Sequence, residues 1–164
     1  DQNYLYYNTP FYPGFYVGFP AMAIGGARRV VDEFEKHTAG RVRFSGINEK
    51  DSPTSQRVLA QLKIEMLSAE ALMAEYIKMM ETDKGGPYEG AKYKAIRATI
   101  IDKCTQIGVK ALLTLGGHAL LKGHPVEIFT RDLIAIATHI TSLYEDGILG
   151  YGRHLFGVQT NIQG

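Results

Sequence analysis

The sequence predicts an all-α protein, an antiparallel four-helix bundle. Four segments of about 20–30 residues carry apolar side chains every three or four positions, the period of an amphipathic helix. Stretches rich in glycine and proline separate these segments, and none alternates apolar and polar residues as a half-buried strand would. Four long helices with short connections pack as an antiparallel bundle, and 164 residues are about one domain.

The first two helices are predicted from apolar stripes. The first helix covers about residues 20–39 and stops at Gly40; its apolar face comprises Ile24, Ala27, Val31 and Phe34. The second begins near Pro53, with Ser52 or Thr54 as its cap. Its seam alternates steps of three and four residues: Leu59, Leu62, Met66, Ala69, Met73, Tyr76 and Met80. We interpret these methionines as core filling, because they are in register with the leucines.

The third and fourth helices follow the same rule. The third covers about residues 90–115, with an apolar face of Tyr93, Ile96, Ile100, Cys104, Ile107, Ala111 and Leu115. Cys104 is therefore interpreted as a small buried residue and not as a nucleophile. The fourth begins near Pro125 and continues to about Tyr144. Its apolar stripe comprises Phe129, Leu133, Ile136 and Ile140, with His139 at the edge.

The two ends of the chain differ from the bundle. We expect residues 20–152 to form the bundle, residues 1–19 an aromatic-rich strap and residues 153–164 a C-terminal tail. The stretch "DQNYLYYNTPFYPGFYVGFP" is dense in tyrosine and phenylalanine, which favours a surface to cover. Two interpretations stay open. The strap packs on a missing domain or a neighbouring subunit, the chain being a fragment of a larger protein, or it crosses its own bundle.

Composition excludes several classes of partner. The formal net charge is +1, from 18 basic and 17 acidic residues, so we expect no nucleic-acid partner. The single cysteine permits no intrachain disulfide and favours a reducing, cytoplasmic setting. No long uncharged apolar run is present, so we expect no membrane partner.

Few residues stand out as chemical groups. The chain has no Gly-x-Gly-x-x-Gly after a strand, no phosphate-binding P-loop, no Gly-x-Ser-x-Gly and no Cys-x-x-Cys. No glutamate lies three residues before a histidine, so we predict no metal site of the di-iron bundle type. Among the glycine pairs, Gly116–Gly117 is the most suggestive, because small residues before a helix let a ligand or another backbone approach closely. His139, taken alone, favours a hydrogen-bonded structural role.

Several stretches, in order, resemble one family. "GFPAMAIGGARRVVDEF" is similar to the first bundle helix of the acyl-CoA dehydrogenase superfamily. "RVRF" followed by "SPTSQRVLAQL" resembles its Arg-x-x-Phe loop and the glutamine that opens the next helix. "LGGHALLKGHPVEIFTRDL" resembles its Gly-Gly, Pro-x-Glu and Arg-Asp series. The resemblance spans nearly the whole chain. It implies the C-terminal helical domain of a larger flavoprotein whose flavin lies between this domain and others.

Two branches of the superfamily compete. Acyl-CoA dehydrogenases commonly carry Glu-Gly-Thr shortly after the Arg-Asp pair, whereas this chain reads "RDLIAIATHITSLYEDG", with His139 seven residues after Asp132. The ending "GYGRHLFG" resembles that of reduced-flavin monooxygenases. The resemblance therefore favours a two-component monooxygenase that uses FMN or FAD, reduced by a separate flavin reductase, and oxygen. Its substrate is expected to be a small aromatic or heteroatom-containing molecule. The alternatives are an FAD-dependent acyl-CoA dehydrogenase and a non-catalytic helical assembly module.

The resemblance also implies roles for individual residues. His139 would be catalytic, beside the flavin ring. Arg41 would reach a flavin phosphate across a subunit interface, although Arg43 is a rival and the spacing after Phe44 is longer than in dehydrogenases. Gly116 and Gly117 would lie near the flavin of an adjoining subunit. The pair Arg131–Asp132 would be chiefly structural. The implied assembly is a homotetramer, and we expect the isolated chain to be inactive.

Overall fold

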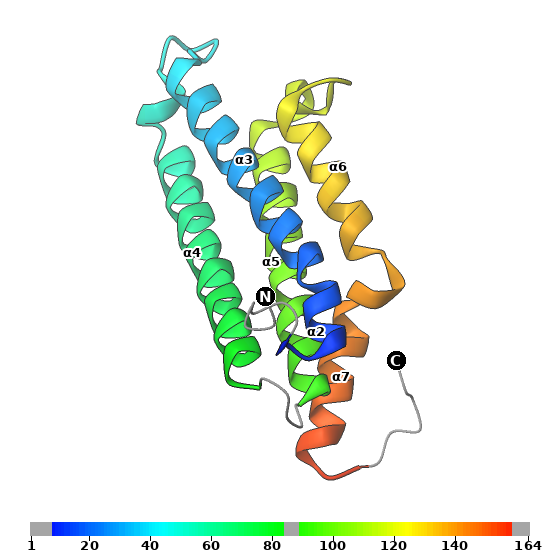
Figure 1. Ribbon diagram of the computed structural model, residues 1–164. Coiled ribbons are helices and arrows are strands. Elements are labelled where there is room, and N and C mark those ends of the chain that lie inside the picture. The colour runs from blue at the N-terminus through cyan, green and yellow to red at the C-terminus, as the bar shows by residue number, and fades with distance from the viewer. Residues whose placement is uncertain (1–7, 84–88, 159–164) are drawn as a thin grey trace.

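The computed structural model describes residues 8–83 and 89–158 (Figure 1). Four long helices follow one another along the chain, each antiparallel to the one before it: α3 (Gly18–Gly40), α4 (Pro53–Thr82), α5 (Gly90–Leu115) and α6 (Pro125–Ala137). The short helix α2 (Phe11–Tyr16) precedes them and α7 (Tyr144–Leu155) follows. The predicted all-α four-helix bundle is confirmed. The connections contain three 3-10 turns, η1 (Glu49–Asp51), η2 (Gly117–Leu120) and η3 (Ile140–Ser142), and an isolated antiparallel bridge between Val42 and Asn48.

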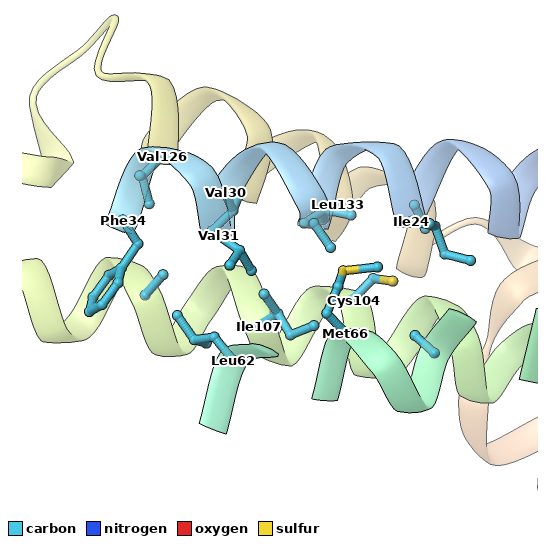
Figure 2. Close-up of a cluster of buried hydrophobic side chains, with 14 of the residues drawn as sticks. Ile24, Val30, Val31, Phe34, Leu62, Met66, Cys104, Ile107, Val126 and Leu133 are labelled. Atoms are coloured by element: carbon cyan, nitrogen blue, oxygen red, sulfur yellow. The ribbon is translucent and has the colours of Figure 1, made fainter. Parts of the chain in front are cut away.

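The core lies where α3, α4, α5 and α6 face one another (Figure 2). Phe34, Leu62 and Ile107 are each at most 2% exposed, and Cys104 is fully buried among them. The apolar faces predicted for the first three helices are buried or packed against the core. Met73 and Leu59, at the edges of the predicted seam, are partly buried. The 3-4 periodicity therefore identified the packed faces correctly, because such stripes are buried only against neighbouring helices.

Glycines on α5 and α7 set how closely helices approach α5. A Cβ at Gly108 would lie 3.0 Å from the Thr130 hydroxyl on α6. A Cβ at Gly147 would lie 2.9 Å from the Cβ of Ala98 and 3.3 Å from the backbone oxygen of Lys94. The α5–α7 contact thus involves backbone that cannot rotate out of the way, as a long side chain could.

The fourth predicted helix is broken, and here the prediction to about Tyr144 was wrong. Helix α6 ends at Ala137, His139 has an extended backbone (φ −67°, ψ 134°), and α7 begins at Tyr144. The Thr138 hydroxyl donates to the Ala135 carbonyl oxygen, and the Thr141 amide donates to the His139 ring. These bonds compete with the helical pattern, which Ser, Thr and similar side chains often interrupt. Ile140, expected on the apolar stripe, is 76% exposed.

The described part of the aromatic N-terminal segment has two different faces. Pro13 and Gly14 are buried, and the Tyr76 hydroxyl of α4 donates to the Pro13 carbonyl oxygen at 2.9 Å. Phe11, Tyr12 and Phe15 point outward and are 57–72% exposed. Helix α2 therefore docks on its own bundle through one face and presents aromatic rings on the other.

Three stretches considered in the sequence lie outside the described residues: 1–7 in the strap, 84–88 with the pair Gly85–Gly86, and 159–164 in the expected tail. Over the described ranges, no helix combines the length and apolar character needed to cross a bilayer.

We predict that Gly147→Ala destabilises the protein by about 1–3 kcal/mol, because the new methyl group would push α7 away from α5. Gly152→Ala is the matched control on the same helix, where a Cβ would meet nothing within 4 Å. The control is expected to stabilise by up to about 1 kcal/mol through helix propensity. Urea unfolding followed by circular dichroism measures both, and equal effects of the two variants would contradict the packing argument.

Candidate functional site at two ends of the bundle

The residues expected to form a site lie at opposite ends of the bundle. Arg41 follows the last residue of α3, and Gly116 follows the last residue of α5, at the end where α6 begins (Figure 1). His139 packs against Phe19, at the beginning of α3. At 1.5 Å per residue, α3 separates these ends by about 30 Å. The structure therefore brings Arg41 and Gly116–Gly117 together and keeps His139 apart from them.

Arg41 is positioned by the end of α5. Its Nη1 donates to the Leu115 carbonyl oxygen at 3.4 Å, where the helix C-terminus carries partial negative charge. The next residue, Gly116, has φ 76° and ψ −164°, a conformation open essentially to glycine alone. A Cβ at Gly116 or Gly117 would meet no other atom within 4 Å, so the backbone there is open to approach. Arg41 and Arg43 line an adjoining pocket of about 310 Å³.

The contacts of the two arginines distinguish between them. Arg43 donates two hydrogen bonds to Glu49, at 2.8 and 2.6 Å, and one to the Ser52 hydroxyl. The Ser55 hydroxyl also donates to Glu49, at 2.6 Å. The hydrogen bonds from Arg43 and Ser55 lower the pKa of Glu49 to about 2. Arg43 thus neutralises a buried carboxylate and holds the loop after α3, which leaves Arg41 as the better candidate to bind an anion.

At the other end, His139 is the N-terminal cap of turn η3. Its Nδ1 accepts from the Thr141 amide at 3.3 Å and lies 2.8 Å from the Thr141 hydroxyl oxygen. An Nδ1 that accepts the amide places the proton of the neutral ring on Nε2. The side chain is exposed, and its ring centroid lies 5.2 Å from that of Phe19. The geometry therefore presents an Nε2–H donor beside an aromatic ring.

The sequence reasoning missed the residue that holds this turn, Arg97 on α5. Arg97 is 5% exposed, and its Nη2 donates to the Thr141 carbonyl oxygen at 2.7 Å. Its guanidinium lies 4.4 Å from the ring centroid of Tyr16. Burial lowers the pKa of Arg97, while Tyr76 and Tyr16 favour its charged form. The sequence offered one signal for Arg97. It follows Ile96, which was expected on the buried face of this helix, so an arginine there could have been recognised as a buried charge.

Other residues singled out in the sequence have structural surroundings. Cys104 is fully buried, and burial raises the pKa of its thiol to about 12, as expected for an unreactive cysteine. Arg131 pairs with Glu127 one helical turn away, at 3.3 Å, and Asp132 is exposed. In the described part of the chain, no three or more histidine, cysteine, aspartate or glutamate side chains are arranged to hold a metal ion.

The described chain is thus a helical bundle domain with an arginine and open glycine backbone at one end and an exposed histidine at the other. Residues 17–142 match the family described as acyl-CoA dehydrogenase, C-terminal domain, and the chain belongs to this family. The resemblance drawn from the motifs is therefore confirmed at this level. None of the curated proteins matches the sequence.

Solved structures with the same fold include different kinds of enzyme. XiaF from Streptomyces sp., in complex with FADH2 and glycerol, has a TM-score of 0.84 and 16% identity, covering 95% of this chain and 41% of XiaF. 3-HSA hydroxylase from Rhodococcus sp. RHA1 has a TM-score of 0.81 and 21% identity, and the match covers 95% of this chain and 42% of the hydroxylase. Glutaryl-CoA dehydrogenase from Mycobacterium smegmatis has a TM-score of 0.76 and 18% identity, and the match covers 92% of this chain and 38% of the dehydrogenase. The chain thus spans 38–42% of the length of these structures.

We predict that Arg43→Met lowers the free energy of unfolding at pH 6, because Glu49 would lose the charged partner of its carboxylate. The pKa of Glu49 is depressed in the folded protein, so its stabilisation is present above about pH 4.5 and is lost as the pH falls toward 2. The difference between variant and wild type should shrink over that range. Urea titrations at several pH values measure it, with Arg57→Met on the exposed face of α4 as control.

We predict that Arg97→Met lowers the free energy of unfolding by about 1–3 kcal/mol, because the Thr141 carbonyl loses its donor and the Tyr16 ring loses its cation. The same variant should loosen η3, since the Thr141 carbonyl loses its donor. Hydrogen exchange at the Ser142 amide, which donates to the His139 carbonyl, should therefore accelerate. The exposed Arg28→Met is the control. Unchanged exchange at Ser142 would refute the positioning role.

Proposed function

We propose that this chain is the C-terminal helical domain of a flavin-dependent oxidoreductase, specifically a two-component monooxygenase. Such an enzyme would use reduced FMN or FAD and oxygen to hydroxylate a small aromatic or heteroatom-containing substrate. The observation that carries the proposal is His139. It is a fixed, exposed imidazole in the region where related dehydrogenases commonly carry Glu-Gly-Thr. The similarity of the fold to XiaF and to 3-HSA hydroxylase supports the monooxygenase branch. The similarity to glutaryl-CoA dehydrogenase makes an acyl-CoA dehydrogenase the alternative.

A flavin fits the residues present at both ends. Arg41 and the open backbone at Gly116 and Gly117 suit a cofactor phosphate. Phe19 and His139 suit the edge of a flat ring. A reduced flavin bound there would supply the electrons for oxygen activation. Because about 30 Å of helix separates the ends, we assign them to different flavin molecules, which requires more than one subunit.

His139 would act as a hydrogen-bond donor. With Nδ1 accepting from Thr141, Nε2–H faces outward and can donate to an oxygen atom of the reacting group. Removal of a proton from a phenolic substrate would need a free Nε2 lone pair, which this tautomer lacks. The arrangement therefore favours proton donation over proton abstraction as the first role of this residue.

The proposed assembly is a homotetramer supplied by a separate flavin reductase. Exposed apolar side chains support burial against other subunits or domains; they include Phe11, Phe15, Phe44, Ile64 and Leu67. The buried, unreactive Cys104 is compatible with the proposed cytoplasmic location.

The test uses the full protein that contains this chain, loaded with chemically reduced flavin and mixed with oxygen. We predict that wild type reoxidises its flavin in two phases and forms little hydrogen peroxide when a hydroxylatable phenol is present. His139→Ala should raise the share of peroxide and lower product per flavin oxidised by about 100-fold, because the donor is lost. His154→Ala, on the exposed surface of α7, is the control.

Three outcomes would defeat this proposal. Single-phase reoxidation that is identical in wild type and His139→Ala would remove the role of the histidine. Direct reduction of the bound flavin by butyryl-CoA, without a reductase, would identify a dehydrogenase instead. A protein that binds no flavin would favour the assembly module.

A further inference from the structure

Three histidines from different parts of the chain meet at the Arg41 end of the bundle. His37 lies in the last turn of α3, His118 lies in η2, and His124 caps the N-terminus of α6. Their ring centroids are 5.7–5.8 Å apart in all three pairs. Nothing in the flavin chemistry proposed above uses these rings.

The polar atoms of this histidine cluster are only partly satisfied. The Nδ1 of His124 accepts from the Val126 amide at 3.3 Å, so in the neutral ring the proton sits on Nε2. The Nε2 of His37 is buried and makes no hydrogen bond within the described residues. A buried ring nitrogen without a partner is unfavourable, and a ligand atom at hydrogen-bond distance would relieve it.

The charges around the cluster favour an anion. Burial is the largest cause that lowers the pKa of His37, and the charges of Arg41, His124 and His118 lower it further. The N-terminus of α6 adds positive partial charge. Glu49, the carboxylate that acts on His37, pairs with Arg43. Glu127, in the first turn of α6, pairs with Arg131 through one oxygen at 3.3 Å, while its other oxygen is buried without a hydrogen bond in the described part of the chain.

We propose that His37, His118 and His124 form, together with Arg41, a binding site for a phosphate-class oxyanion, and that binding is coupled to protonation of the histidines. The guanidinium and the ring N–H groups are donors suited to tetrahedral oxyanions. The permanent charge of Arg41 disfavours a metal cation at the same place. The proposal rests on the role given above to Arg41 and extends it. An anion here draws protons onto the histidines, so it binds more tightly below neutral pH.

The experiment uses sulfate as the probe, because sulfate mimics phosphate and keeps its charge between pH 6 and 8. Histidine ring resonances of this chain are followed by NMR as sulfate is added. Sulfate should raise the pKa of the three histidines, and its affinity should fall about tenfold from pH 6 to pH 8. The variant His37→Gln/His118→Gln/His124→Asn should bind about tenfold more weakly at pH 6 and with little pH dependence. Asparagine at position 124 can still cap α6.

Two further variants keep the result interpretable. His118→Gln changes only an exposed side chain, so it leaves the core intact and should still weaken sulfate binding at pH 6. The control His154→Gln, on α7 at the opposite end, should bind like wild type.

ADP binding more tightly than pyrophosphate would support a nucleotide cofactor as the source of the anion, and equal binding would support a free inorganic anion.

The proposal is overturned if sulfate leaves the three histidine pKa values unchanged, or if the triple variant binds sulfate as wild type does at pH 6. It is also overturned if Zn²⁺ binds to these rings and sulfate does not. These readouts are independent of oxygen chemistry, so a failure of the monooxygenase proposal at His139 would leave them unaffected.

Discussion

Close packing around α5 is the constraint on which the rest of the molecule depends. This helix contacts α3, α4, α6 and α7, and small residues of α5 meet two of these helices closely: Gly108 faces Thr130 of α6, and Ala98 faces Gly147 of α7. Interiors packed to crystal-like density leave no room for larger side chains there. The positions of α6 and α7, and hence of the turn between them, follow from that packing.

Each end of α5 holds residues of one of the two proposed sites in place. Near its beginning, Arg97 holds the Thr141 carbonyl and thereby the turn that fixes His139. At its other end, the Leu115 carbonyl holds Arg41, and Gly116 leaves the backbone open. One helix thus positions the residues of two proposed sites, which are about 30 Å apart and therefore too distant for a single small ligand. This geometry is what links the proposed function to an assembly of several subunits.

The fold and the buried faces could be predicted from the sequence, and the surroundings of the site could not. The stripe from Leu62 to Met80 and the inert Cys104 follow from spacing alone, because helical periodicity states which side chains share a face. The expected continuation of the fourth helix through Ile140 failed. Apolar spacing cannot reveal side chains that compete for backbone hydrogen bonds, as Thr138 and His139 do.

The sequence by itself determined an all-α bundle, its family resemblance and the candidates His139, Arg41, Gly116 and Gly117. These properties are local, since they depend on residue order and on spacing within one helix. Only the tertiary structure decided that Arg43, and not Arg41, forms the hydrogen bonds to Glu49. It also decided that Arg97 holds the turn at His139 and that three histidine rings lie close together near Arg41. The Arg43–Glu49 pair closes the connection between α3 and α4, and the other two facts join residues from different helices or turns. Such contacts arise from three-dimensional packing, which no one-dimensional period encodes.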